Sequence, residues 1–339
     1  MARRIRRSEP LRRAAQKAAD WIESRQSADG SIDRAGGIAS IYKTTFALVA
    51  AGRLPAAWRL MDFVADHWMT EPGEFHINDE SWLDKATAFY RNCYILKAAL
   101  RLGRFDIASP AALDHLFRYQ HRGGGFCPGL NRAGRHRVNS MHACMGGWLC
   151  LYATRLDRAV RAGDFLLNLI RKQPDMPNRF YFFTNTRTGR CITKFDPGTA
   201  VVHVADRKLP RQQFFQVGAI MGFLADLYRA TGKAKYLRGA EKMFTVDQGM
   251  HPRSFEWPSK CKAGWGAALL YSVTGNRAHR RTAERVARTT MLRSQRRDGS
   301  WPDFQFPQRD DGTGFVISSM ELTAEFTFEL CEMAKAMAR

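Results

Sequence analysis

The segment 139–148 places polar side chains inside an otherwise apolar, small-residue helical pattern. His142 stands near the start of this pattern, and a buried polar group costs about 1–3 kcal/mol unless it finds a partner. An imidazole in that position is a candidate general acid or base, and Asn139 and Cys144 are candidate substrate-binding residues beside it. The alternative is a hydrogen-bonded histidine in the core.

A second candidate group lies in the acidic and aromatic segment 78–87. Asp79 could act as an acid at a cavity mouth, because an apolar pocket raises the pKa of a carboxyl group toward that of a proton donor. Trp82 is a candidate surface for substrate binding. The alternative is ordinary capping of a helix N-terminus, for which Asp and Ser are the preferred residues.

A third group lies between residues 178 and 211. Asp196 and His203, together with Tyr181, form a candidate acid–base set above a cavity. The alternative for Asp196 is a turn residue before a proline, and for His203 an exposed position.

The C-terminal third of the chain supplies the remaining candidates. Lys262 precedes an apolar helical pattern and could hold an anion, while Trp265 could stack on a substrate or on a cation. Glu321 and Glu325 stand four residues apart on one helical face, and Glu325 is surrounded by apolar residues. We therefore predict a catalytic role for Glu325, with a solvated face as the alternative.

The charge balance favours anionic partners. The 339 residues contain 53 Lys and Arg against 32 Asp and Glu, which gives a net charge of +21. A field of this sign attracts acidic substrates, but we expect no specific nucleic-acid binding because the sequence contains no recognition motif. The basic segment 1–13 could contact an anionic membrane surface peripherally, or could be the solvated start of a helix.

The seven cysteines are scattered, and no Cys-x-x-Cys pair occurs. This pattern favours a reducing compartment, so we expect a cytoplasmic protein without a structural zinc site. Nothing in the sequence requires a metal or an organic cofactor. We expect a small-molecule substrate.

A repeated turn sets the expected architecture. The segments 26–31, 120–126 and 295–301 each begin with glutamine and end in a glycine-containing turn, and weaker echoes begin near 69, 173 and 248. Steps of about 50 residues hold two helices of typical length. We therefore predict one all-α domain over 1–339, an (α/α)6 toroid of six helical hairpins around a central cavity.

The longest step contains an insertion at 178–211. Its residues 179–195 carry aromatic and β-branched side chains on both sides of a glycine-containing turn, which predicts a short β-hairpin. Insertions of this length are often binding or lid elements.

The glutamine–glycine turns at 26, 120 and 295 resemble the repeats of the terpenoid cyclase and prenyltransferase α/α-toroid superfamily. The segments ending in Thr231-Gly232 and Thr274-Gly275 resemble six-hairpin carbohydrate enzymes, namely glycosidases, epimerases and polyuronate lyases. Both resemblances imply the same fold.

The cyclase motifs are incomplete in this chain. Class II terpenoid cyclases protonate an alkene with the middle aspartate of an Asp-x-Asp-Asp motif followed by Thr-Ala, and the nearest match, Asp196 to Ala200, retains one aspartate. The Asp-x-Cys zinc motif of protein prenyltransferases is absent, as is the Cys-His-Gly motif of lanthionine cyclases.

Three functional hypotheses follow. The main one is acid–base cyclisation or isomerisation of an isoprenoid inside an aromatic cavity, and it rests on the glutamine–glycine turns and the Asp196 echo. The alternatives are a lyase, glycosidase or epimerase acting on an acidic sugar, and a non-enzymatic binding scaffold. The 22 Phe, 9 Tyr and 8 Trp residues suit both enzyme classes, because aromatic faces stabilise cations and stack on sugars.

Overall fold

The computed structural model describes residues 2–32, 37–76, 82–131, 135–307, 309 and 311–338. Within these ranges, outer and inner helices alternate through six hairpins. The outer helices are α1 (Ala2–Glu23), α4 (Leu54–Trp68), α6 (Pro110–Phe117), α9 (Leu156–Arg171), α12 (Ala234–Gln248) and α14 (Arg277–Val286). The inner helices are α3 (Thr44–Ala50), preceded by the short α2 (Gly37–Ile41), and α5 (Trp82–Leu102), α8 (Ser140–Tyr152), α11 (Phe215–Thr231), α13 (Cys261–Thr274) and α15 (Ser319–Ala338).

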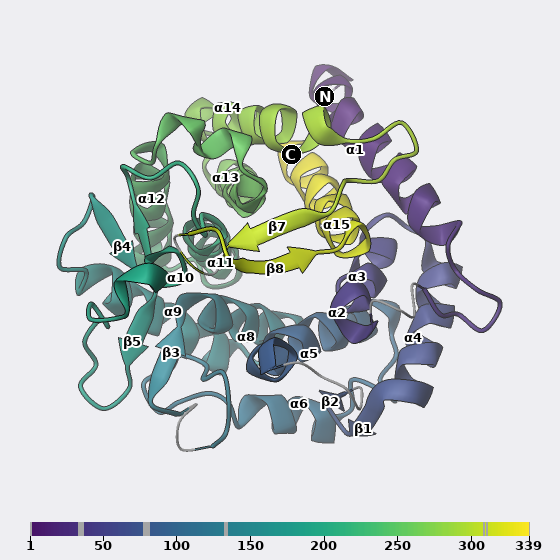
Figure 1. Cartoon of the computed structure of the whole chain (residues 1–339), viewed down its shortest axis with the longest axis horizontal. Coiled ribbons are helices and arrows are strands. Elements are labelled where there is room, and N and C mark those ends of the chain that lie inside the picture. The colour runs from purple at the N-terminus through teal and green to yellow at the C-terminus, as the bar shows by residue number, and fades with distance from the viewer. Residues whose placement is uncertain are drawn as a thin grey trace.

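The inner helices form a closed ring, and the outer helices surround it (Figure 1). Around the ring α3 contacts α5, α5 contacts α8, and the contacts continue through α11, α13 and α15 back to α3. The predicted (α/α)6 toroid is therefore confirmed. Residues 2–13 of the basic segment belong to α1, and whether the segment contacts a membrane stays a prediction.

Hydrophobic patterning separates the two layers of helices. The inner helices α8, α11 and α13 are buried over most of their length, so they are apolar on nearly every side. The outer helix α9 buries one stripe at helical spacing, including Ala159, Ala162, Phe165 and Leu169. No helix among the described residues combines the length and the apolar composition needed to cross a membrane.

Glycine lets the inner helices α11 and α13 approach each other closely. A Cβ atom on Gly218 would lie 2.3 Å from the backbone carbon of Lys262, and one on Gly266 would lie 2.4 Å from the Gly218 carbonyl oxygen. Only glycine leaves the space for such backbone contact. This close packing fixes the start of α13 against α11.

The repeated glutamines join neighbouring outer helices. The side-chain amide of Gln26 donates to the carbonyl of Gly30 in its own turn (3.1 Å) and to that of Ala56 in α4 (2.9 Å). The amide of Gln120 likewise donates to Gly124 (2.9 Å) and to Arg158 in α9 (2.9 Å). Each turn therefore ties the end of one outer helix to the start of the next.

The third such turn closes the ring. The amide of Gln295 donates to Gly299 and to Ala14 in α1, both at 2.9 Å. The indole of Trp21 in α1 also donates to Asp298 at 3.1 Å. The sixth hairpin is thus joined to the first, 281 residues earlier in the chain.

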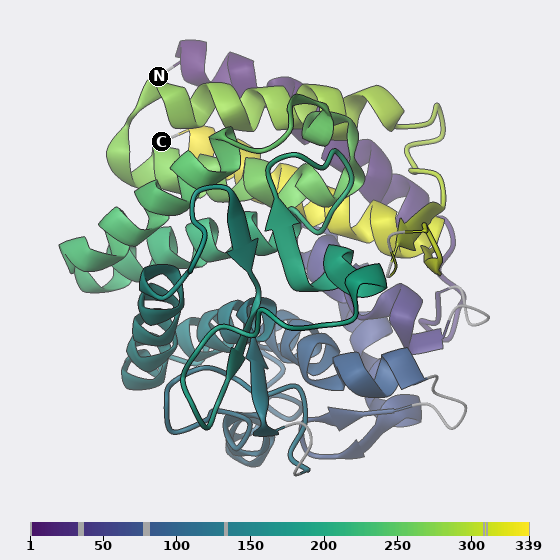
Figure 2. The same ribbon diagram turned by 60° about the vertical axis from the view of Figure 1, so that its left-hand side comes forward.

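The insertion is built from short strands on the outside of the ring (Figure 2). The hairpin expected around 179–195 is present as a turn with a bridge between Thr184 and Cys191. The longer ladders use partners from outside that segment. They are β3 (Arg137–Asn139) with β5 (Phe183–Asn185), and β4 (Arg179–Tyr181) with β6 (Val204–Asp206). A short helix, α10 (Ala200–His203), precedes β6.

Two further hairpins connect the helices. One is β1 (Met69–Glu71) with β2 (Glu74–Phe75). The other, β7 (Phe304–Pro307) with β8 (Gly314–Ile317), extends over the centre of the ring in Figure 1. The sequence analysis did not predict the β7–β8 hairpin, although it covers one end of the central space.

The closing turn provides a stability test with an internal control. Gly299 has a φ of +102°, and its Cβ atom would lie 2.4 Å from the carbonyl oxygen of Lys17. Gly275 also has a positive φ, +69°, but open space around it. We expect Gly275→Ala to cost about 1–2 kcal/mol of unfolding free energy from backbone strain. Gly299→Ala should cost about 1–3 kcal/mol more, because the outer helix must shift.

Urea unfolding followed by circular dichroism measures both variants against the wild type. Equal losses at the two glycines would show that the contact with α1 does not determine the stability of the ring.

Candidate functional site

The inner helices enclose a cavity of about 400 Å³ with a charged floor and an aromatic roof. The hairpin β7–β8 supplies Phe304, Phe306 and Phe315 to the roof, and Phe215 lies at the start of α11. The polar lining residues are Tyr42, Lys43, Thr87, Tyr90, Arg91, Asn139, His142, Gln213, Gln216, Ser259, Cys261, Lys262, Glu321 and Glu325. Most of them lie near the beginnings of the inner helices, which therefore all start at this end of the ring.

A chain of alternating charges forms the floor. The Lys43 ammonium donates to Glu321 at 2.8 Å and also to Glu325. Lys262 forms ion pairs with Glu325 and, at 3.2 Å, with Glu329. All five side chains are buried or nearly so, and the side chain of Glu321 is the most accessible of the glutamates at 13% exposure.

This network keeps the Lys43 ammonium charged. Burial is the largest single influence and acts to lower the pKa of Lys43, but Glu321 and the neighbouring tyrosines together outweigh it and hold that pKa well above the usual value. Burial raises the pKa of Glu329, and Lys262 opposes the rise. One carboxyl oxygen of Glu329 has no hydrogen-bond partner among the described residues. The floor thus places two lysines beside three glutamates, and one carboxyl oxygen of Glu329 is left without a partner in the part of the chain that the structure describes.

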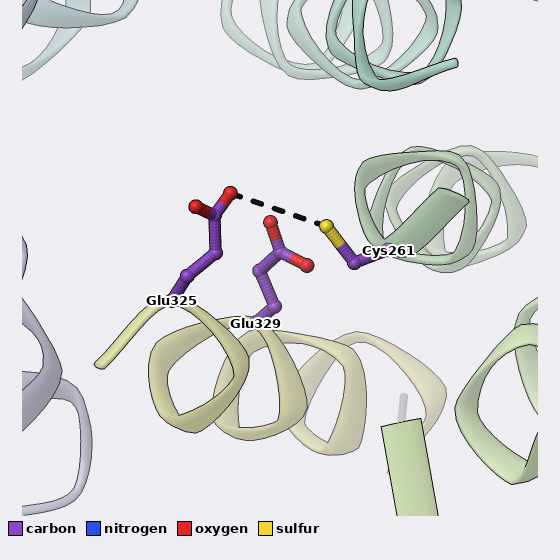
Figure 3. Close-up of side chains that lie close together, drawn as sticks. All are labelled: Cys261, Glu325 and Glu329. Atoms are coloured by element: carbon purple, nitrogen blue, oxygen red, sulfur yellow. Dashed lines mark hydrogen bonds between the residues drawn. The ribbon is translucent and has the colours of Figure 1, made fainter. Parts of the chain in front are cut away.

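Cys261, Glu325 and Glu329 lie within 4.8 Å of one another and could offer a thiol and two carboxylates to a metal ion (Figure 3). The carboxylates, however, already accept hydrogen bonds from Lys43 and Lys262. Burial also holds the pKa of the Cys261 thiol well above its usual value. In this geometry the lysines supply the positive charge that a metal would bring, and a cation would have to displace them.

His142 presents an uncharged imidazole to the cavity. Burial, with a smaller contribution from Arg137, lowers its pKa to about 4. Its Nδ1 has no hydrogen-bond partner in the described ranges, and its ring contacts Phe89 edge-on at 5.8 Å between centroids. A neutral imidazole with a free nitrogen can accept a proton or a hydrogen bond from a bound hydroxyl group.

Amide side chains order the polar wall next to His142. The Asn139 side chain caps α8 by accepting from the Met141 amide at 2.6 Å. The Ser140 hydroxyl donates to Gln216 at 2.6 Å, and Gln216 donates to Gln213 at 3.2 Å. These bonds fix the orientation of the amides that face the cavity.

The structure brings together four of the residues selected from the sequence. Asn139, His142, Lys262 and Glu325 all line the central cavity, although they come from β3, α8, α13 and α15. Their catalytic and binding roles stay predictions.

The candidate residues of the insertion lie elsewhere. Asp196 is 57% exposed, caps a turn by accepting from the Gly198 amide and pairs with Arg309 at 3.4 Å. Tyr181 is buried and does not line the central cavity. His203 bonds to the carbonyl of Thr199 through Nδ1 and stacks on a phenylalanine outside the cavity. The predicted acid–base set above the cavity is therefore not assembled.

Two other candidates occupy different positions. Cys144 is fully buried and is not among the residues that line the central cavity. Trp265 lies beyond the floor, where its ring stacks on Trp148 at 4.8 Å. Asp79 and the side chain of Trp82 lie outside the described residues.

The sequence analysis missed Lys43, Tyr42 and Tyr90, and gave Glu321 no role of its own. The signal for Lys43 was present, because it is a charge between the apolar stretch ending at Ile41 and the run that begins at Phe46. The rule that selected His142, a polar residue within an apolar pattern, applies equally to Lys43.

The buried tyrosines near the floor generate a test at alkaline pH. Burial holds the pKa of Tyr94 well above 10, and the nearby Tyr90 adds to the rise. Above pH 10 the unfolded chain releases this proton while the folded chain retains it, so stability falls as pH rises. The expected loss is about 1.4 kcal/mol per pH unit for each such tyrosine.

Tyr94→Phe should therefore lose less stability than the wild type between pH 8 and pH 11. Urea midpoints measured at both pH values decide this. Parallel losses in the two proteins would show that the phenol of Tyr94 ionises freely in the folded state.

No protein-family model matches the chain, and no curated protein matches it. Solved structures do match it. A D-mannose isomerase gives a TM-score of 0.67 at 12% identity, over 96% of this chain and 97% of that chain. The GH76A alpha-1,6-mannanase of a Salegentibacter species gives 0.62 at 12% identity, over 97% and 100%. A possible GH105 member from Salmonella enterica gives 0.62 at 10% identity, over 97% and 94%.

Identities this low show a shared fold and nothing finer. The likeness extends over nearly the whole of both chains in each comparison, in agreement with the six-hairpin toroid. Of the two resemblances drawn from the sequence, these structures fit the six-hairpin carbohydrate enzymes. They give no support to the terpenoid cyclase resemblance.

Proposed function

We propose that this protein is a carbohydrate-active enzyme that moves a proton between neighbouring carbons of a small sugar, as sugar isomerases and epimerases do. The observation that carries the proposal is the lysine-held glutamate network beneath a phenylalanine roof in the central cavity. Proton transfer at a carbon next to a carbonyl needs a fixed base and a cation close to the carbonyl oxygen. The floor offers both.

Glu321 is the base in this proposal. Its Oε1 accepts from the Tyr42 hydroxyl and the Lys43 ammonium, both at 2.8 Å, and its side chain is the most accessible of the floor carboxylates. The carboxylate takes the proton from carbon and returns it to the adjacent carbon. The ammonium of Lys43 stabilises the oxyanion that develops in between, and a prearranged charge of this kind lowers the barrier.

In this proposal His142 transfers a proton between two oxygen atoms of the sugar. Conversion of an aldose into a ketose also shifts a proton between two hydroxyl oxygens, and a neutral imidazole can accept one and donate the other. The pKa of about 4 keeps His142 uncharged at neutral pH, so its imidazole can accept a proton.

The roof suits a sugar ring. Phe304, Phe306 and Phe315 come from β7–β8, and Phe215 comes from the start of α11. Aromatic faces stack on the C–H faces of sugars and exclude water from the reacting centre.

The charges in the cavity favour a neutral sugar as the first probe. The lining contains three basic side chains, Lys43, Arg91 and Lys262. It also contains Glu321 and Glu325, and Glu329 pairs with Lys262 behind them, so basic and acidic side chains are equal in number. The excess charge of +21 therefore lies mostly outside the cavity. An acidic sugar remains an expectation from composition, and hexoses related to mannose are the first probes because a compared structure is a mannose isomerase.

The isoprenoid hypothesis has weaker support. Its proton donor was Asp196, which is more than half exposed and paired with Arg309. An alkene is protonated by a carboxylic acid that an enclosed, apolar site keeps neutral, and the surroundings of Asp196 are the opposite.

A second candidate is hydrolysis of a glycosidic bond. Glu321 and Glu325 lie one helical turn apart on α15, and both accept from the same Nζ of Lys43. A pair of carboxyl groups at short range is the usual equipment of glycosidases. The GH76 mannanase among the compared structures makes α-1,6-mannotriose the probe for this candidate.

Proton NMR in D2O separates the two candidates. We expect D-mannose to lose its C2 proton signal by exchange with solvent as a second hexose appears. Glu321→Gln should lower kcat by about 10²–10⁴-fold, the usual contribution of a general base. Glu284→Gln, a like change in the outer helix α14, is the matched control and should leave the rate unchanged.

Release of mannose from α-1,6-mannotriose without exchange at C2 would establish hydrolysis instead. If a broad panel of aldoses and oligosaccharides gives neither reaction, and none of them raises the melting temperature, the carbohydrate proposal is wrong.

A further inference from the structure

The ring holds a second cavity at the opposite ends of the inner helices. It has a volume of about 420 Å³. Its lining residues are Phe46, Lys97, Trp148, Leu151, Tyr152, Asp226, Arg229, Ala230, Trp265, Leu269, Glu332, Lys335 and Ala336. The two cavities share no lining residue, so this is a separate site.

Aromatic side chains stand between the cavities. The ring centroids of Phe46, Tyr94 and Phe328 lie 5.3–5.9 Å from one another, mostly edge-on. On α5, Tyr94 stands one turn after Tyr90 of the first cavity and one turn before Lys97 of the second. A molecule in one cavity therefore does not touch the other.

Lys97 places a primary amine at the wall of the second cavity. The residue is only 1% exposed. Its Nζ lies over the rings of Tyr94 (4.5 Å), Phe46 (4.7 Å), Tyr152 (5.6 Å) and Trp148 (5.7 Å). Within the described part of the chain, this nitrogen forms no hydrogen bond and no ion pair.

The acidic groups near Lys97 are already engaged. Glu332 accepts from Arg101 at 2.9 Å. Asp226 accepts from Arg229 at 2.8 Å and from the indole of Trp148 at 2.9 Å. A buried lysine normally has a counter-ion or a hydrogen-bond acceptor, so the unpartnered Lys97 requires an explanation.

The electrostatic surroundings favour an uncharged amine. Burial lowers the pKa of Lys97 to about 7, and the positive charges of Arg101 and Lys262 act in the same direction. Cys93 and Glu332 oppose the shift. A desolvated lysine beside other cations is the usual setting of a nucleophilic amine.

We propose that Lys97 is the reactive group of a second site, which takes small hydroxylated aldehydes as a covalent imine. The Nζ lone pair attacks the carbonyl carbon and forms a C–N bond, which gives a carbinolamine. The carbinolamine hydroxyl then takes one proton from solvent and leaves as water, the nitrogen lone pair forms the C=N bond, and the resulting iminium can release its N–H proton to solvent. The step is a condensation and needs no oxidant or reductant.

The walls of the cavity define this ligand class. Trp265 lines the cavity, and its buried indole nitrogen lacks a hydrogen-bond partner among the described residues. The stacked rings of Trp148 and Trp265 offer an apolar face. Arg229 and the exposed Lys335 make the outer part of the cavity polar. A short polyhydroxylated aldehyde matches this combination.

Reductive trapping with DL-glyceraldehyde and sodium cyanoborohydride tests the proposal on the wild-type protein. Peptide mass spectrometry gives the extent of adduct formation at each lysine. At pH 7 we expect Lys97 to react about tenfold or more faster than Lys335, because an ordinary lysine with a pKa near 10.4 is almost fully protonated there. The rate at Lys97 should reach half its maximum near pH 7.

Two variants complete the experiment. Lys97→Met keeps the length and apolar body of the side chain and should fold, as judged by circular dichroism, while it loses the fast adduct. Lys233→Met removes the same charge from an exposed position and should retain the fast adduct. Labelling that follows surface exposure and leaves Lys97 unmodified would overturn the proposal. This readout does not depend on activity in the central cavity, so it stands or fails separately from the proposed function.

Discussion

Closure of the ring is the constraint on which the rest of the structure depends. The inner helices are apolar on nearly every side, so each needs neighbours on both flanks as well as an outer helix. An open row would leave the first and last hairpins exposed, and the Gln295 turn prevents this by bonding to Ala14 in α1. The close approach of Gly299 to the carbonyl group of Lys17 sets the distance between this turn and α1. Both cavities lie inside the ring and therefore depend on this contact between the Gln295 turn and α1.

Closure also explains how the molecule tolerates so much buried charge. A buried ion pair gains little net stability, but the loss of one partner costs about 3–5 kcal/mol because it leaves an uncompensated charge. Lys260 and Asp247, both fully buried and 2.6 Å apart, illustrate this in a purely structural role at the start of α13. Lys43 and Glu325 join α3 to α15 in the same way across the site. The charged side chains proposed for catalysis are therefore positioned by ion pairs between inner helices.

Local signals made the fold predictable, and non-local pairing limited the prediction. The glutamine–glycine turn bonds within itself and to the next outer helix, so its repetition revealed the toroid. The partners of β3 and β4 come from other segments of the chain. The β7–β8 hairpin joins consecutive strands around Asp311-Gly312, so its signal was local and was overlooked. In the site, His142 and Glu325 were found as polar residues within apolar helical patterns. Asp196 was selected because its surroundings partly match a cyclase motif. Its exposed position shows that such a partial match does not predict burial.

The inner helices run parallel to one another, so their dipoles create a different electrostatic potential at each end of the ring. Their N-terminal ends meet at the central cavity, where the helix dipole favours carboxylates, and Glu321 lies in the first turn of α15. Their C-terminal ends meet at the second cavity, where Arg101, Arg229 and Lys335 lie in last turns. Lys97 lies one turn further in than Arg101, beyond the reach of the terminal field. It therefore has neither a dipole nor a carboxylate to stabilise its charge, and burial lowers its pKa although aromatic rings surround the nitrogen.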